Sequence, residues 1–191
     1  MPERPSPYRR EGEHGLIEIK LSTIQQLYAT LDPAPFFEKD LDADAEEYIL
    51  VAVQDLGLRR PFKIVFYLPP EQAESAEAGD IERSIHNYFA YRLWAGEHEL
   101  KALFRNGWIW LAVGLVFLAV CITARQFALT FEPEPVAHVV AEGLLLVGWV
   151  AMWRPLQTFL YDWWPIRRRC RSFAKLAAIP VEVRPGATDV L

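Results

Sequence analysis

Residues 106–124 read NGWIWLAVGLVFLAVCITA and contain no charged side chain. As a helix, these 19 residues would extend about 28 Å, close to the roughly 30 Å hydrocarbon thickness of a bilayer. A second apolar run, residues 136–153, follows a short loop and carries His138 and Glu142 near its start. The two runs predict a transmembrane helical hairpin, and the rest of the chain is a polar head before it and a tail after it.

Charge divides the chain near the start of the hairpin. Residues 1–105 carry 12 Lys and Arg against 19 Asp and Glu, whereas residues 106–191 carry 8 against 6. An acidic head argues against a nucleic-acid partner, which would require a basic surface. Cys121 falls in the first apolar run and Cys170 beyond the second, so no disulfide is expected.

The head begins with a tail and a strand signal. Residues 1–14 are charged and contain prolines, which predicts a disordered tail with structure starting at Gly15. Residues 16–21 alternate apolar and charged side chains, the pattern of a half-buried strand. Residues 24–31 have apolar side chains at helical spacing and predict a helix, which the prolines that follow would end.

The rest of the head alternates helix and strand. A helix is predicted from Asp40 or Asp42, because acidic residues crowd its first turns and an apolar face follows. Residues 62–68 alternate again and predict a second strand. Residues 71–79 are acidic and small and predict a mobile loop, after which Asp80 is expected to cap a long helix that leads to the first apolar run.

The tail supplies a further strand signal at residues 181–183, which we expect to dock on the sheet of the head, because two strands alone are marginally stable. The predicted fold class is an α+β membrane protein. It has a small cytoplasmic α/β domain, in the order β-α-α-β-α plus a C-terminal strand, and an α-helical two-span transmembrane hairpin. The predicted divisions are a disordered tail (1–14), the α/β domain (15–105), the hairpin with an interfacial aromatic segment (106–164) and a basic tail (165–191) whose strand 181–184 docks on the head.

Basic residues gather at one end of the predicted hairpin. Those near its entry and exit are Arg92, Lys101, Arg105, Arg154, Arg167, Arg168, Arg169, Arg171 and Lys175. The intervening loop, residues 125–135, has one arginine and two glutamates. The positive-inside rule then places both termini in the cytoplasm.

Residues 154–165 are aromatic but interrupted by charge. They predict either a short helix in the headgroup plane or a continuation of the second span after a proline kink. Six residues in this segment and in the arginine cluster after it are predicted to contact lipid at the interface: Arg154, Trp163, Trp164, Arg167, Arg168 and Arg169. The alternative is that the arginines only determine topology.

Several segments resemble a family of uncharacterised two-span inner-membrane proteins of bacteria. They are LDPAPF (31–36), DLD (40–42), AEEYI (45–49), GWVAMWRPL (148–156) and FLYDWWPI (159–166). The resemblance covers residues 15–184. It implies a bacterial inner (cytoplasmic) membrane setting and no particular activity.

The second apolar run carries the sharpest candidate site. His138 and Glu142 are four residues apart and share one helix face. An ionisable residue inside a span is a functional hypothesis by default, and Arg125 at the end of the first span could neutralise Glu142. The alternative is that the pair is shallow enough for water to reach it.

Other constellations are weaker. Arg154 and Asp162 either pair around Pro155 or are separately solvated. Glu82 and His86 lack further ligands for a metal site, so neither a metal nor any cofactor is predicted. The sequence contains no recognisable catalytic motif.

The sequence therefore predicts a non-enzymatic inner-membrane scaffold, adaptor or accessory subunit that presents a small cytoplasmic domain. The alternative is a homo-oligomeric channel or ion-conducting assembly lined by the second span, since two spans cannot enclose a pore without a symmetric ring. The expected partners are membrane lipid and either further copies of the chain or another membrane protein, with no nucleic acid.

Overall fold

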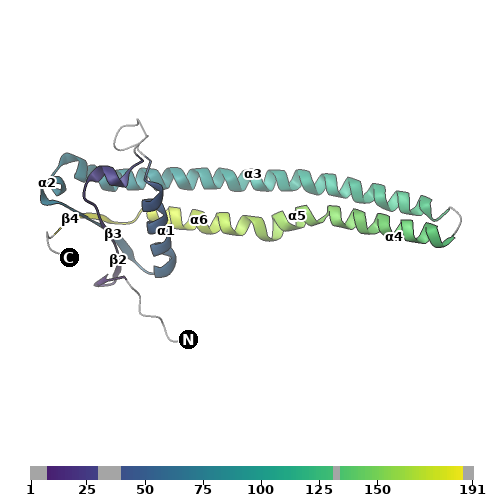
Figure 1. Cartoon of the computed structure of the whole chain (residues 1–191), viewed down its shortest axis with the longest axis horizontal. Coiled ribbons are helices and arrows are strands. Elements are labelled where there is room, and N and C mark those ends of the chain that lie inside the picture. The colour runs from purple at the N-terminus through teal and green to yellow at the C-terminus, as the bar shows by residue number, and fades with distance from the viewer. Residues whose placement is uncertain (1–7, 30–39, 131–133, 187–191) are drawn as a thin grey trace. The chain divides into compact units, whose positions relative to one another are not determined.

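The computed structural model describes residues 8–29, 40–130 and 134–186. The protein is a mixed α+β chain with a small sheet and two long apolar helices (Figure 1). It divides into two compact units: Met1–Ala95 with Arg169–Leu191, and Gly96–Arg168. The strand β4 (Val181–Pro185) near the C-terminal end thus belongs with the segment before the hairpin, and from here on the head means this whole sheet-containing unit.

Within the described residues, the head contains one four-stranded sheet in the order β1-β2-β3-β4. The strands are β1 (Arg10–Glu11), β2 (His14–Lys20), β3 (Phe62–Leu68) and β4 (Val181–Pro185). β1 and β2 are antiparallel, and the other two pairs are parallel. β4 pairs with β3 through Ile64↔Val181 and Phe66↔Val183, so the predicted C-terminal strand does lie on the sheet.

One face of the sheet forms the core of the head. Ile17, Ile64 and Phe66 on this face are fully buried and pack with apolar residues of two helices, α1 (Ala43–Leu56) and the first part of α3 (Ala76–Ala128). α1 begins as the sequence predicted, because the Asp42 side chain caps it by accepting a hydrogen bond from the Asp44 N–H. Gly57, with φ of +79°, ends it in a conformation that other residues rarely adopt.

The prediction that structure begins at Gly15 is wrong. β1 precedes it, and a two-residue turn connects β1 to β2 with Glu11 opposite His14. Gly12 takes the first position of that turn with φ of +63°, the position at which tight hairpin turns favour glycine. Residues 1–7 of the predicted tail lie outside the described residues.

The prediction of a helix over residues 24–31 is also wrong. Among the described residues 24–29 only one 3-10 turn forms, η1 (Ile24–Leu27), and it already buries both of its apolar side chains. Residues 30 and 31 of the predicted helix lie outside the described residues. Tyr28 leaves the turn in an extended conformation and bridges to Leu41, so the chain turns away before a helix can propagate.

Residues 71–79 are not a loop. They contain a short helix, α2 (Pro70–Ala73), and the start of α3. Asp80 is therefore not the cap of the long helix. Ser75 caps α3 instead, because its hydroxyl accepts a hydrogen bond from the Ala78 N–H.

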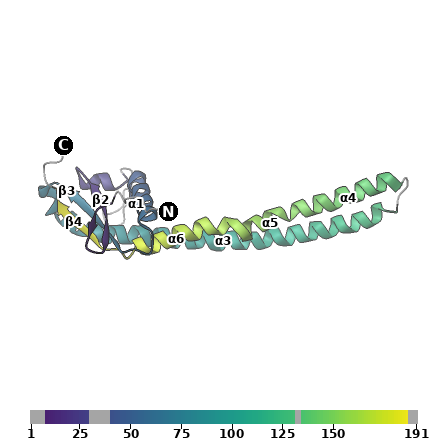
Figure 2. The same ribbon diagram turned by 90° about the horizontal axis from the view of Figure 1, so that it is seen from below.

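The second unit is an antiparallel pair of helices, which Figures 1 and 2 show lying side by side. The C-terminal part of α3 forms one side. The other side is formed by α4 (Glu134–Ala151), α5 (Trp153–Gln157), a π-helical turn η3 (Thr158–Asp162) and the first part of α6 (Trp163–Leu176), whose remaining residues belong to the head. By length and composition, Ala78–Ala128 and Glu134–Leu176 each qualify to cross a membrane, with window hydropathies of 2.2 and 1.7.

Small residues bring the two sides of this hairpin together. A Cβ on Gly148 of α4 would lie 2.9 Å from the Cys121 Cβ of α3, and one on Gly107 would lie 2.9 Å from the Thr158 Cγ2. Only a hydrogen at these positions allows the backbones to approach so closely, as is common between membrane helices.

Candidate functional site

His138 and Glu142 both lie on α4 and are both exposed on its outer surface. Their spacing places them on one side of the helix, one turn apart. No hydrogen bond or ion pair joins the two side chains in the described part of the chain. The surface of α4 therefore carries two ionisable groups in an otherwise apolar surround, because their exposed neighbours include Val139 (72% exposed) and Leu146 (67% exposed).

Arg125, the third member of this predicted site, lies in the last turn of α3 and is partly buried. Its Nε atom is buried and has no hydrogen-bond partner among the described residues. The structure does not join it to Glu142, because no ion pair within 4.0 Å connects the two in the described residues. The neutralisation considered from the sequence is thus absent, and Glu142 remains exposed.

The π-helical turn η3 contains a polar contact that the sequence left open. Arg154 and Asp162 form an ion pair of 3.6 Å, so the two charges are paired and not separately solvated. The buried Thr158 hydroxyl lies between them and donates to the Arg154 carbonyl at 3.2 Å. The chain continues through Pro155 as α5, η3 and α6, so the helical path of the second side extends well beyond the predicted span.

The six residues predicted to contact lipid gather around this turn. Arg154 and Trp164 are 62% and 59% exposed, and Arg167, Arg168 and Arg169 are all exposed. Trp163 is partly buried, and its indole N–H donates to the Phe159 carbonyl at 2.8 Å. The Arg167 guanidinium lies over the Trp163 ring at 5.7 Å, a cation–π distance.

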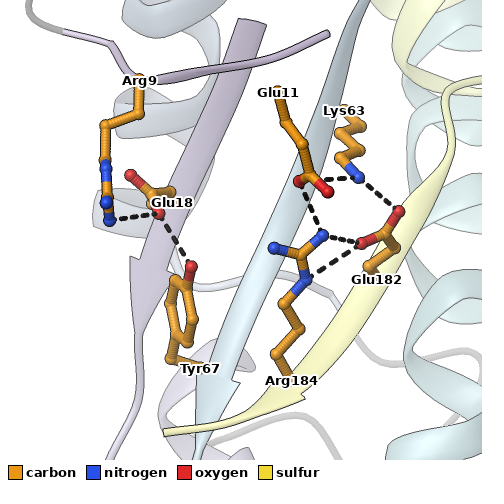
Figure 3. Close-up of polar contacts among 7 residues, drawn as sticks. All are labelled: Arg9, Glu11, Glu18, Lys63, Tyr67, Glu182 and Arg184. Carbon is orange, nitrogen blue, oxygen red and sulfur yellow. Dashed lines mark hydrogen bonds and ion pairs between the residues drawn. The ribbon is translucent and has the colours of Figure 1, made fainter. Parts of the chain in front are cut away.

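The head contains a charged cluster that sequence reasoning missed. Lys63, Glu11, Arg184 and Glu182 form a closed ring of alternating charge, which we call the ion-pair ring (Figure 3). Lys63 lies 3.1 Å from Glu11 and 2.6 Å from Glu182, and Arg184 lies 2.7 Å and 2.6 Å from the same two carboxylates. The ring joins β1, β3 and β4, three strands that are far apart in the sequence.

This ring lies on the sheet face opposite the core. Side chains alternate along β3, so Lys63, Val65 and Tyr67 share that face. Val65, between Lys63 and Tyr67 on this face, is nevertheless fully buried. Beside the ring, the Tyr67 hydroxyl donates to Glu18 at 2.8 Å, and Arg9 lies 3.8 Å from Glu18 (Figure 3).

Mutual hydrogen bonds fix the charges of the ring. The Arg184 guanidinium holds the pKa of Glu11 below its usual value, and the Lys63 ammonium does the same to the pKa of Glu182. The hydrogen bond to Glu182 in turn raises the pKa of Lys63. All four groups are thus charged at neutral pH, and Lys63 is only 12% exposed.

A second unpredicted cluster joins α1 to α3. The Glu46 side chain is 13% exposed, lies 2.7 Å from Arg92 and accepts a hydrogen bond from the Tyr88 hydroxyl at 2.8 Å. Burial, followed by that hydrogen bond, raises the pKa of Tyr88. Glu46 was grouped with the acidic start of α1 in the sequence, but its side chain is occupied inside the head.

The remaining histidine and cysteine side chains of the head and hairpin do not add a candidate site. His86 contacts the Ile179 carbonyl at 2.7 Å and so helps to hold the C-terminal segment, and Cys121 and Cys170 are both buried thiols that form no disulfide among the described residues. The described residues include no group of three or more His, Cys, Asp or Glu side chains that could hold a metal ion. No protein-family model, curated protein or solved structure matches this chain.

Proposed function

We propose that this protein is a non-enzymatic membrane-anchored scaffold, adaptor or accessory subunit, in which the hairpin is inserted in a bacterial inner membrane and the head is presented to the cytoplasm. One observation carries the proposal: the outer surface of the hairpin is covered by large apolar side chains. Only 17% of the apolar 18-residue window of each candidate span is buried inside the structure. Burial within the protein therefore does not account for their apolar character.

The apolar surface extends along both sides of the hairpin. Its exposed members are Trp108, Ile109, Trp110, Val113, Leu115, Val116, Phe117, Val120 and Ile122 on α3, and Val136, Val139, Val140, Leu145, Leu146, Val147, Trp149 and Val150 on α4. Exposed apolar patches beyond a few hundred Å² mark interaction or membrane surfaces. Apolar side chains that point outward on every side of a helical pair are favourable in the hydrocarbon of a bilayer and unfavourable in water.

Charge supports the proposed orientation. Arg105, Arg154 and Arg167 lie at the end of the hairpin that leads to the head, whereas the opposite end has Arg125 as its one basic residue. Basic residues flanking spans stay on the cytoplasmic side. The head and both termini are therefore assigned to the cytoplasm.

Chain connectivity supports the adaptor role. β3 precedes the hairpin and β4 follows it, and these two strands are direct neighbours in the sheet. The sheet is thus completed by segments from both ends of the anchor, so the anchor holds the head by two chain connections instead of one flexible linker. Such a head suits the presentation of its charged sheet face to a soluble partner.

The test is affinity purification of the full chain from bacterial membranes after mild cross-linking. The adaptor proposal expects a protein captured in near-stoichiometric amount and lost when Arg9 and Lys20, exposed at the charged face, are both changed to Glu. Arg83→Glu is the matched control, because Arg83 is 68% exposed on the helix that covers the other face. Retention of the partner by the Arg9/Lys20 variant would reject this face, and capture of no partner would reject the adaptor role.

A second candidate, a homo-oligomeric ion-conducting assembly lined by α4, is favoured by the exposure of His138 and Glu142. If it is correct, Glu142→Gln changes ion flux in liposomes that contain the protein. Liposomes that hold the wild-type chain without measurable flux would remove it.

A further inference from the structure

α4 carries two adjacent stripes of side chains, and only one of them is used within the hairpin. The first stripe, with Ala137, Ala141 and Gly148, is buried against α3. The second consists of His138, Glu142, Leu145 and Trp149, which we call the outer stripe. Its members are spaced four, three and four residues apart, which is the spacing of a helix–helix seam.

Every member of the outer stripe is exposed, including Leu145 at 42% and Trp149 at 60%. At 100° per residue, these four side chains cover a sector of about 60° beside the packed stripe. The outer stripe is thus a narrow, continuous band that α3 leaves uncovered.

Because two members of the outer stripe are ionisable, contact of this stripe with lipid hydrocarbon is unfavourable. Glu142 lies eight residues into α4, about 12 Å along the helix axis. Ionisable side chains at membrane depth face protein or water and pair with one another, because hydrocarbon offers no hydrogen bond. Within the described residues, neither His138 nor Glu142 has an ion-pair partner in its own chain.

We infer that the outer stripe binds a second copy of this chain. Copies inserted with the same topology lie parallel, so their outer stripes run side by side in the same direction. In a heptad seam each side chain packs among the neighbouring seam residues of the partner helix. His138 of one copy and Glu142 of the other are then one helical turn apart, about 6 Å along the axis. The His138 imidazole N–H donates across this turn and the Glu142 carboxylate accepts.

Self-complementarity is the reason to choose a second copy over a different protein. One patch supplies both members of the pair, and a two-fold axis along the membrane normal satisfies both copies at once. Leu145 and Trp149 then extend the contact toward the cytoplasmic end. The inference rests on the proposed membrane insertion and adds to it a partner and a surface.

The experiment is cysteine cross-linking of the full-length chain in intact membranes. Leu145→Cys is compared with Val147→Cys, which lies on the same helix but about 160° away from Leu145. Val147 is more exposed than Leu145, 54% against 42%, so simple accessibility favours the control. The wild-type chain, whose Cys121 and Cys170 are buried, gives the background.

The expected result is a disulfide-linked dimer for Leu145→Cys at least several-fold above that for Val147→Cys. Equal cross-linking at both positions, or none at Leu145, would overturn the inference. Membrane fractionation of the same samples separates the two failures. A chain absent from the membrane fraction contradicts the proposed anchoring, whereas a membrane-bound chain that does not cross-link contradicts only the seam.

A second measurement tests the polar pair itself. The double variant His138→Leu, Glu142→Leu keeps an apolar band of similar size but removes the interhelical hydrogen bonds. We expect the monomer–dimer dissociation constant in lipid to rise by roughly 3- to 30-fold, given what polar contacts between membrane helices contribute. An unchanged or lower constant would contradict the assignment of these two residues to the interface.

Discussion

Gly148 illustrates how a single residue controls the hairpin. A Cβ there would lie 2.9 Å from the Cys121 Cβ and 3.0 Å from Leu118 Cδ1. The Cys121 Cβ is fixed to the backbone of α3, so relief requires the helices to separate. Gly143, five residues earlier on the same helix, would meet nothing within 4 Å.

These contacts predict opposite effects of the same change. Gly148→Ala should destabilise the hairpin by about 1–3 kcal/mol through overpacking. Gly143→Ala should be neutral or stabilise it by up to about 1 kcal/mol, since alanine favours helix. Denaturant titration of the protein in micelles measures both, and similar losses for the two variants would contradict the packing described.

Glu46 plays a comparable part in the head, where it ties α1 to α3 through Arg92 and Tyr88. Glu46→Ala should lower the stability of the head by about 2–3 kcal/mol, because the hydrogen bond from Tyr88 and the ion pair with Arg92 are both lost. Glu47→Ala is the control, since Glu47 is exposed, and should change stability by less than about 0.5 kcal/mol. Pulse proteolysis of the full chain in urea distinguishes the two.

The ion-pair ring predicts a pH dependence with a defined sign. The pKa values of Glu11 and Glu182 are lowered in the folded protein, so their stabilising contribution is complete above the unfolded value of about 4.3 and is lost as the pH falls through the folded values. The pKa of Lys63 is raised, so its contribution holds below about 10.4 and is lost as the pH rises through the folded value.

The measurement is hydrogen exchange of the β4 amides, expressed as protection relative to intrinsic rates. Protection in the wild type should exceed that in Glu182→Gln at pH 7, and the difference should shrink below a pH of about 4. A difference that stays constant across this range would show that the ring does not hold β4.

At the scale of elements, β4 completes the sheet. Val181 is 9% exposed and belongs to the core of the head, while its neighbour Glu182 belongs to the ring on the other face. The strand is therefore held from both faces.

Val181→Asp should detach this strand, because it places a carboxylate in the core without a partner, at a cost of about 3 kcal/mol or more. Limited proteolysis of the full chain should then cut near the C-terminus many times faster than in the wild type. Ala178→Asp, at an exposed position three residues earlier, serves as the control and should leave the cleavage rate unchanged.

For the whole molecule, the proposed topology makes a prediction about access. A cysteine introduced at Thr130, between α3 and α4, should react with a membrane-impermeant maleimide added outside intact cells once the outer membrane is permeabilised. A cysteine at Glu71, exposed in the head, should react only after the inner membrane is opened. The reverse pattern would place the head outside the cytoplasm.

Local signals were sufficient for several elements. The alternation in residues 62–68, the Asp42 cap and the valines at 181 and 183 predicted β3, α1 and β4 because each pattern records which side of an element is buried. Local signals failed at residues 24–31, where Tyr28 pairs with Leu41, and at Asp80, where Ser75 provides an earlier cap. In both places a contact or a competing cap outweighed helical spacing.

The sequence by itself determined the two apolar helices and most elements of the head, because hydrophobic length and periodicity are properties of neighbouring residues. Only the tertiary structure decided that Glu11, Lys63, Glu182 and Arg184 form one ring, since strand order and register bring together residues far apart in the chain. It also decided which stripe of α4 is packed, because Gly148 meets Cys121 and leaves His138 and Glu142 outside. The sequence of α4 contains two stripes with the spacing of helix–helix contacts, and only one of them packs against α3.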